Sequence, residues 1–254
     1  MPSAAQSISD QSAIDYYKAF VNFIKIQSKL YADKVFVRYH VNKSFKTLTY
    51  SQVDHITTNL ACEWAKQVEG SGVISYISDH SIDYLLTMIA LMKLRSTLLA
   101  VSPRNSKAAI VNLLEKTNSK VFFTSPKYEA IAKSASVKIE GFSVIVVNPF
   151  DIEALLNQPL NDRQNEFIDT SFTEKDLNKP ALIIHRYVSP LIKKYYEALL
   201  IFYFSSGTTN YPKPIYLTNR YVLNLCGVFK LCKEQNPHLD LVKQSDVFLT
   251  CVPL

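Results

Sequence analysis

Between residues 73 and 147 the sequence repeats one pattern, in which a short apolar run without polar alternation is followed by an amphipathic helical segment. The apolar runs are Val73–Ile77, Thr97–Val101, Val121–Thr124 and Phe142–Val147. The helical segments between them are Ile82–Leu94, Ser106–Lys116 and a segment that begins at Ser125 and Pro126. A strand that is apolar on both sides needs cover on both faces, which helices on each side of a parallel sheet supply. The sequence therefore predicts an α/β fold with a mostly parallel sheet flanked by helices.

The segments on either side extend this pattern. Upstream, the apolar spacing predicts a helix over 14–24, a strand over 35–39, and a helix that starts at a Thr49–Gln52 capping box and runs to Gly70. Downstream, the pattern weakens into a polar stretch with a short helix near 152–156. The remaining expected elements are strands at 181–184, 198–204 and 215–217, a helix from Asn219 to about 235 and a strand at 247–252.

Composition narrows the functional classes. The net charge of +6 comes from scattered residues without a basic stripe, which argues against nucleic acid as a partner. The four cysteines have neither metal-ligand spacing nor a disulfide pattern, so reduced buried thiols are expected. The N-terminus has no apolar signal region, and the longest apolar stretches are shorter than the ~20 residues a membrane helix needs. We expect a cytoplasmic protein without a transmembrane segment.

One hydroxyl-rich loop, Phe204–Lys213, has the composition of a phosphate-binding loop. It follows an apolar run and contains Gly207, one of only five glycines in the chain. Glycine lets the backbone approach an anion closely, and hydroxyl and backbone N–H groups can donate to phosphate oxygens. Lys213 adds a positive charge. The loop is not a Walker A motif, because Pro214 stands where Ser or Thr would follow the lysine. By composition alone, an ordinary turn is the alternative.

The ordered string Ser-Ser-Gly-Thr-Thr-x-x-Pro-Lys at 205–213 closely resembles the signature loop of the adenylate-forming superfamily, which includes acyl-CoA synthetases, luciferases and nonribosomal peptide synthetase adenylation domains. Two earlier segments, 48–53 and 90–103, resemble that family's earlier motifs in the same order. The residues at 102–106 and 212–215 look most like the fungal nonribosomal-peptide-synthetase-like and aminoadipate-reductase-type branch. The resemblance covers residues 13–254 and implies the N-terminal part of the adenylate-forming fold.

The resemblance implies an ATP-dependent ligase that activates a carboxylic acid as an acyl-adenylate. ATP or AMP would be bound, Mg²⁺ would accompany the nucleotide without an identified protein ligand, and a thiol of CoA or of a phosphopantetheine carrier would accept the acyl group. The implied β- and γ-phosphate contacts fall on Ser205, Ser206, Gly207, Thr208, Thr209 and Lys213. These residues would position and stabilise charge and would not transfer protons, so no catalytic acid or base is assigned. Asn210 departs from the family's usual glycine.

The expected organisation is a disordered tail at 1–12 and a partial AMP-binding domain at 13–254. The sequence ends at 250–254 in what resembles the start of the family's fourth motif, so the adenine, ribose and carboxylate contacts are expected to be missing. We therefore expect the chain alone to be an inactive ligase fragment. The alternatives are a noncatalytic, truncated or mis-spliced product of the same fold that acts as an interaction module, and an unrelated phosphate-binding α/β protein.

In the branch that this sequence resembles, the strand at 181–185 would run directly into the loop that starts at Ser205. Here residues 186–204 lie between the two. Many are Tyr, Lys, Ile, Leu or Phe, which A/T-only codons can encode, and the start of the segment is compatible with a splice donor. We interpret it as a translated intron or as an ordinary insertion in which 198–204 forms the strand before the loop.

Other candidate residues receive structural interpretations. His185 follows an apolar run and lies near the resembled substrate pocket, but a structural role is preferred. Tyr50 and Trp64 have helical spacing typical of packing. Asp79, Asp83 and Asp246 are expected to cap helices or to face solvent.

Overall fold

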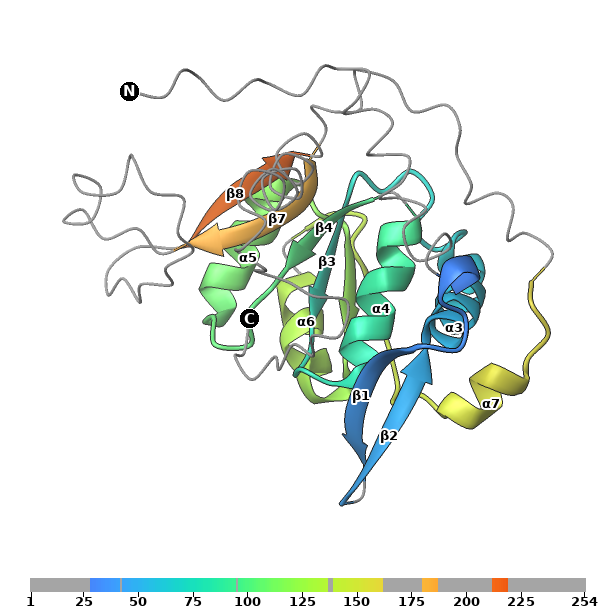
Figure 1. Ribbon diagram of the computed structural model, residues 1–254. Helices are drawn as coiled ribbons and strands as arrows, with labels where there is room; N and C mark the ends of the chain where they lie inside the picture. The colour runs from blue at the N-terminus through green and yellow to red at the C-terminus, as the bar shows by residue number, and fades with distance from the viewer. Residues whose placement is uncertain are drawn as a thin grey trace, which may run out of the picture.

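A computed structural model describes residues 28–41, 43–94, 96–136, 139–161, 180–186 and 212–218 (Figure 1). The expected tail at 1–12, the expected helices at 14–24 and 219–235, and the expected strands at 198–204 and 247–252 lie outside these residues. The elements in chain order are β1 (Val35–Val41), β2 (Ser44–Thr49), α3 (Tyr50–Trp64), β3 (Val73–Ile77), α4 (Ile82–Lys93), β4 (Thr97–Ala100), α5 (Lys107–Thr117), β5 (Val121–Thr124), the 3-10 turn η1 (Pro126–Tyr128), α6 (Glu129–Ser136), β6 (Ser143–Val146), α7 (Ile152–Asn157), β7 (Pro180–Arg186) and β8 (Lys213–Thr218).

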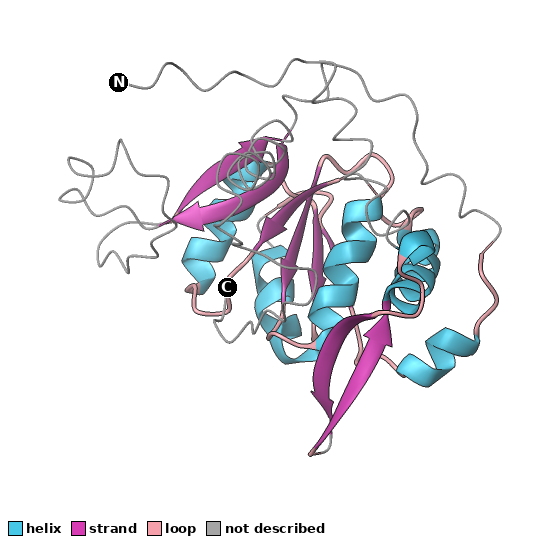
Figure 2. Cartoon of the chain, viewed as in Figure 1, coloured by secondary structure: helices cyan, strands magenta, loops and turns pink. Residues whose placement is uncertain are grey.

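The main sheet has six strands in the order β6-β5-β3-β4-β7-β8. All neighbours pair in parallel except β7 and β8, which are antiparallel. Figure 2 shows helices in front of and behind these strands. The predicted α/β class with a mostly parallel sheet is therefore confirmed.

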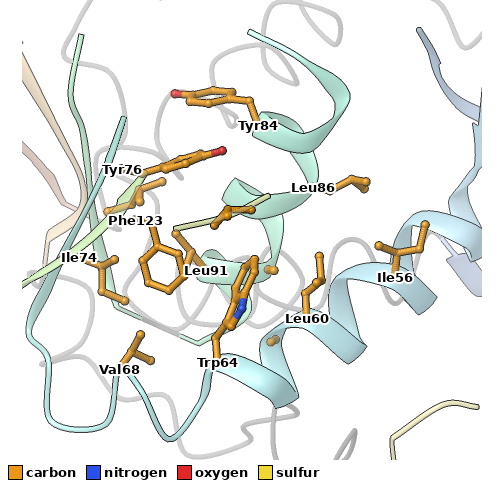
Figure 3. Packing of buried hydrophobic residues seen from close by; sticks show 14 of the residues in the cluster. Ile56, Leu60, Trp64, Val68, Ile74, Tyr76, Tyr84, Leu86, Leu91 and Phe123 are labelled. Atoms are coloured by element: carbon orange, nitrogen blue, oxygen red, sulfur yellow. The ribbon is translucent and has the colours of Figure 1, made fainter. Parts of the chain in front are cut away.

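Both faces of the central strands are buried, and alternate residues point to opposite faces. On β3, Ile74 and Tyr76 pack with α3 and α4, whereas Ile77 packs with α5 and α6. On β5, Phe123 lies edge-on to Trp64 of α3, with ring centroids 5.1 Å apart, and Phe122 faces the opposite cluster. Figure 3 shows Trp64, Leu91 and Phe123 packed together on the α3 and α4 side. This two-sided burial explains why the strands lack polar alternation.

The predicted helix starts match well, because the capping side chains are visible in the sequence. The Thr49 hydroxyl accepts a hydrogen bond from the Gln52 amide, and the Gln52 side chain accepts one from the Thr49 amide. The hydroxyls of Ser81 and Ser106 likewise accept a hydrogen bond from a backbone amide in the first turn of α4 and of α5. At the other end of α5, Asn118 takes the left-handed conformation, with φ of 52°, which ends the helix.

The expected end of the helix that starts after Thr49 was wrong. Helix α3 ends at Trp64 instead of reaching Gly70, although Val68 in the following turns stays buried. The expected helix start at Ser125 and Pro126 is confirmed, because Ser125 is the N-cap of a first 3-10 turn that continues into α6. The antiparallel strand β2 was not expected, because four of its six residues are exposed and only Leu48 is fully buried, which leaves little apolar periodicity.

Helices α3 and α4 are joined by a largely buried ion pair. The ammonium of Lys93 lies 2.7 Å from a carboxylate oxygen of Asp54 and also donates to the Asp54 carbonyl and to the Thr58 hydroxyl. The second Asp54 oxygen accepts from Ser28. The two charged side chains are 12% and 21% exposed, so each depends on the other for the contacts that water would otherwise supply.

Replacing Lys93 by methionine keeps most of the aliphatic stem but leaves Asp54 without its cation. We expect Lys93→Met to lower the free energy of unfolding by about 2 to 3 kcal/mol, because an unpaired, mostly buried carboxylate is strongly disfavoured. The matched control is Lys46→Met, which removes a pair with Glu153 whose side chains are 51% and 80% exposed. We expect Lys46→Met to lower the free energy of unfolding, measured by urea denaturation, by less than about 0.5 kcal/mol. Equal effects of the two substitutions would contradict this account.

Candidate functional site

The phosphate-loop sequence lies between the two strands that end the main sheet. Strand β7 is parallel to β4, with Leu98 opposite Leu182, and antiparallel to β8, with Arg186 opposite Lys213 in the last pair. The chain between these two residues leaves β7 at its carboxyl end. That end lies at the same sheet edge as the carboxyl ends of β3, β4, β5 and β6, because these strands are parallel.

Of the predicted phosphate contacts, the structure describes Lys213 alone. Ser205, Ser206, Gly207, Thr208 and Thr209 lie outside the described residues. Lys213 is the first residue of β8 and is exposed, whereas Pro212 immediately before it is buried. The described part of the chain offers Lys213 no ion-pair partner. Its side chain is exposed, and Lys213 follows the segment 205–212 directly in the sequence.

The β7–β8 hairpin is attached to α5 near the middle of its ladder, where Tyr216 is paired with Ile183. The Tyr216 hydroxyl donates a hydrogen bond of 3.3 Å to the carbonyl of Lys116, in the last turn of that helix. The predicted strand at 181–184 lies within β7, and the predicted strand at 215–217 lies within β8. His185 belongs to β7 and is paired with Pro214.

The carboxyl edge of the sheet also contains a topological switch point. Strands β4 and β5 lie on opposite sides of β3, and the connecting helices α4 and α5 pack on opposite faces of the sheet. The loops after β3 and β4 therefore diverge at this point. In open α/β sheets, ligands bind in the crevice that such diverging loops leave. The β7–β8 hairpin is next to β4, on the side away from β3. The loops after β3 and β4 and the connection that follows β7 therefore lie at the same edge of the sheet.

An ion pair links the loop after β3 to the turn after β5 at this edge. One carboxylate oxygen of Asp79 lies 2.6 Å from the ammonium of Lys127, and the other accepts a hydrogen bond of 2.5 Å from the Tyr128 hydroxyl. The hydrogen bond from Lys127, followed by that from Tyr128, holds the pKa of Asp79 below its usual value. The same contact with Asp79 raises the pKa of Lys127.

Two stacked tyrosines and a carboxylate lie behind this edge. Tyr76 and Tyr84 stack with centroids 5.0 Å apart, and burial raises the pKa of both, that of Tyr84 to about 12 (Figure 3). Asp83, in the first turn of α4, accepts a hydrogen bond from the Phe150 amide in the segment after β6. Burial raises the pKa of the Asp83 carboxyl, and the bond from Phe150 partly opposes that shift. At neutral pH both tyrosines are uncharged and act as packing residues.

The structure tests the roles that the sequence predicted for the remaining candidate residues. Trp64 is buried, and Tyr50 makes ring contacts with Tyr31 and Phe36, so the predicted packing roles of Tyr50 and Trp64 are confirmed. Asp79 does not cap α4, because Ser81 does, but its side chain is 56% exposed, so the alternative expectation of a solvent-facing residue is confirmed. Asp246 lies outside the described residues. The partnership of Asp79 with Lys127 was missed, since residues 48 positions apart give no local sequence signal.

The described residues contain no group of three His, Cys, Asp or Glu side chains placed to hold a metal ion. Mg²⁺ favours a few carboxylates together with substrate phosphates. No protein ligand for Mg²⁺ is therefore assigned in this part of the chain. Among the helices that the structure describes, none combines the length and the apolar character needed to cross a bilayer.

Comparison with known proteins gives consistent matches. A family model described as AMP-binding enzyme matches residues 24–254. An adenylate-forming reductase from Aspergillus terreus is 29% identical over 168 residues, which is 63% of this chain and 13% of that protein. The chain thus spans a small part of this curated relative.

Solved structures show the same fold. The o-succinylbenzoate CoA synthetase from Bacillus subtilis, in complex with its acyl-adenylate intermediate, matches with a TM-score of 0.60 and 14% identity over 91% of this chain and 49% of that chain. The same enzyme in complex with ATP and magnesium ion matches with a TM-score of 0.57 and 12% identity, over 91% of this chain and 50% of that one. This chain therefore spans about half of that synthetase. At such identities these matches show the fold alone.

The contacts of Asp79 can be tested by its titration. Because hydrogen bonds to the ionised form lower its pKa, the stability that they contribute is present above the unfolded-state pKa and is lost as pH falls through the folded-state value. We expect Lys127→Met to raise the Asp79 pKa toward its usual value, and by more than Tyr128→Phe does. Carboxyl carbon chemical shifts across an acid titration measure this. An Asp79 midpoint unchanged by both substitutions would show that the contacts are absent in solution.

Proposed function

Because this chain belongs to the AMP-binding enzyme family, as its loop motif predicted, we propose that the segment Ser205–Lys213 binds the polyphosphate of ATP. The protein would use this contact to activate a carboxylic acid as an acyl-adenylate. The observation that carries the proposal is the antiparallel β7–β8 hairpin, which places an exposed Lys213 at the carboxyl edge of a parallel sheet. The adenylate-forming reductase relative supports the reductase-type branch.

The proposed reaction is an in-line displacement. A carboxylate oxygen attacks the α-phosphorus of ATP, the bond to the bridging oxygen breaks, and pyrophosphate leaves. The Lys213 ammonium would offset negative charge on the β- and γ-phosphates, while Ser205, Ser206, Thr208 and Thr209 would donate hydrogen bonds to their oxygens. Gly207 would let the backbone approach those oxygens. Mg²⁺, bound with the nucleotide, would neutralise further phosphate charge.

The acceptor and the setting are also proposals. The acyl group would pass to a thiol, either that of CoA or that of a phosphopantetheine carrier. A cytoplasmic location suits Cys62, which is a buried cysteine. Nucleotide binding is the activity that we assign to the residues of this chain. Turnover of a carboxylic acid is proposed for a protein that also supplies adenine, ribose and carboxylate contacts.

We further propose that residues 187–204 are an insertion in the β7–β8 hairpin and are not needed to form it. The β7–β8 ladder already closes at Arg186 and Lys213, one residue beyond the expected boundary at 186. Joining Arg186 to Ser205 would leave the eight residues 205–212 to connect the last ladder pair, in place of the 26 residues 187–212. This arrangement favours the insertion or translated intron over a strand at 198–204.

Nucleotide binding is tested by replacing Lys213. We expect Lys213→Ala to weaken ATP binding by about ten- to a hundredfold, because a hydrogen bond to a charged group is lost, and to weaken AMP binding much less. Calorimetry with ATP and AMP measures the difference. Hydrogen exchange should show ATP-dependent protection over 205–213 that Lys213→Ala removes.

The matched control is Lys120→Ala. Lys120 is also exposed but precedes β5, at the opposite edge of the sheet. The Lys120→Ala variant should bind ATP with the affinity of the unaltered chain. If the unaltered chain showed no protection at saturating ATP, a noncatalytic product of the same fold would be the better account.

The insertion is tested by deleting residues 187–204. Shortening the connection from 187–212 to 205–212 lowers the entropy cost of closing the hairpin by about 1 kcal/mol, so the free energy of unfolding should rise by about that amount while ATP binding is retained. A control that replaces 187–204 by a Gly/Ser linker of equal length separates length from sequence. Transcript sequencing gives an independent measurement. Weaker ATP binding by the deletion variant, together with retention of the segment in most mature messages, would contradict the proposal.

A further inference from the structure

The β1–β2 hairpin concentrates positive charge that looks scattered along the sequence. Residues 34–49 contain four cationic side chains and no Asp or Glu, within a chain whose net charge is +6. The four are Lys34, Arg38, Lys43 and Lys46. Figure 1 shows this hairpin projecting away from the main sheet. Its charge is therefore presented to the surroundings on a separate structural element.

The two faces of the hairpin differ. On the inner face, Val37, Tyr39 and Leu48 pack into the core that includes α3, and Lys46 pairs with Glu153 of α7. On the outer face, the register places Arg38 opposite Thr47 and His40 opposite Phe45, and all four are exposed. The His40 and Phe45 rings meet edge-on, with centroids 5.4 Å apart.

The outer face combines unpaired cations with an exposed ring. Phe45 is 73% exposed, the largest value among the exposed large apolar side chains of the described residues. Within that part of the chain, neither Arg38 nor Lys43 has an ion-pair partner. Lys43, at the turn, has a positive φ of 64°, is exposed and lies two residues before Phe45 in the sequence. An anionic ligand would complement the charges of Arg38 and Lys43.

Strand β1 also has a free backbone edge. Among the described residues, β1 pairs with β2 and with no other strand, so one row of its N–H and C=O groups lacks a strand partner. Such an edge can accept another extended polypeptide through main-chain hydrogen bonds. A lipid surface or a nucleic acid cannot supply the alternating backbone donors and acceptors that would match it.

We propose that the free edge of β1 and the outer face of the hairpin bind an acidic, extended segment of a partner protein. Acidic residues at alternate positions of the added strand would lie beside Arg38 and His40, which are two residues apart on one face. The other alternate side chains of the added strand would point to the opposite face, away from Phe45, which lies across the hairpin from His40.

The charge of the edge also explains why a general strand partner does not fit. Basic residues on an edge strand protect it against pairing with other sheets, because most incoming strands would leave the cations unpaired. An acidic strand removes that penalty by pairing with them. The same residues would thus exclude most strands and select an acidic one.

The test uses the full chain and two synthetic peptides, one alternating glutamate with valine and one alternating lysine with valine. The glutamate peptide should bind and protect alternate β1 amides from hydrogen exchange, and the lysine peptide should not. Arg38→Glu should weaken binding of the glutamate peptide by about tenfold and favour the lysine peptide. Phe45→Ala, which changes no charge, should leave the preference for the glutamate peptide over the lysine peptide unaltered.

Lys66→Glu is the matched control, because it makes the same charge change at an exposed position just after α3. It should leave peptide binding unaltered, and Arg38→Glu should leave ATP binding unaltered, so this proposal can fail independently of the proposed nucleotide site. Equal losses in Arg38→Glu and Lys66→Glu would overturn it by showing nonspecific attraction. Binding of phosphatidylserine vesicles or short single-stranded DNA without binding of the glutamate peptide would also overturn it, as would protected β1 amides in the absence of any peptide.

Discussion

Burial of both faces of the central strands is the constraint on which the rest of the structure depends. Tyr76, Phe122 and Phe123 are at most 1% exposed, although they belong to strands of only four or five residues. Such short strands can bury side chains on both sides only if helices cover each face. The connections from β3 to β4 and from β4 to β5 therefore run over opposite faces, which creates the switch point at the carboxyl edge. The β7–β8 hairpin continues the sheet on the other side of β4, next to this switch point.

The sequence predicted the parts of the fold whose signals are local. The apolar runs of β3, β4 and β5 and the capping residues Thr49, Ser81 and Ser106 are visible without any tertiary information. Strand β2 was missed because its pairing with β1 buries few of its side chains, so its periodicity is weak. The end of α3 was placed too late because Val68 keeps the apolar spacing although the backbone has left the helix.

The site was predicted from a different kind of signal. The order of residues in 205–213 identified the family, which the match over 24–254 confirms. Lys213 was predicted as a cation near the loop. It is exposed and belongs to the last β7–β8 pair before the connecting segment. The contacts of Asp79 with Lys127 and Tyr128 could not be predicted, because they form only when the ends of β3 and β5 become neighbours. The concentration of charge on β1 and β2 likewise appears only when the two strands pair.

The hydrogen bond between Tyr216 and the Lys116 carbonyl anchors the last hairpin of the sheet near the middle of its ladder, where Tyr216 lies opposite Ile183. The carbonyl belongs to the final turn of α5, where backbone acceptors have no partner within the helix, so the tie requires no rearrangement of that helix. A hairpin held by a ladder and a tyrosine can change the length of its tip without loss of anchorage. Evolution, or an error of RNA processing, could therefore alter the connection between β7 and β8 while the framework behind it still assembles.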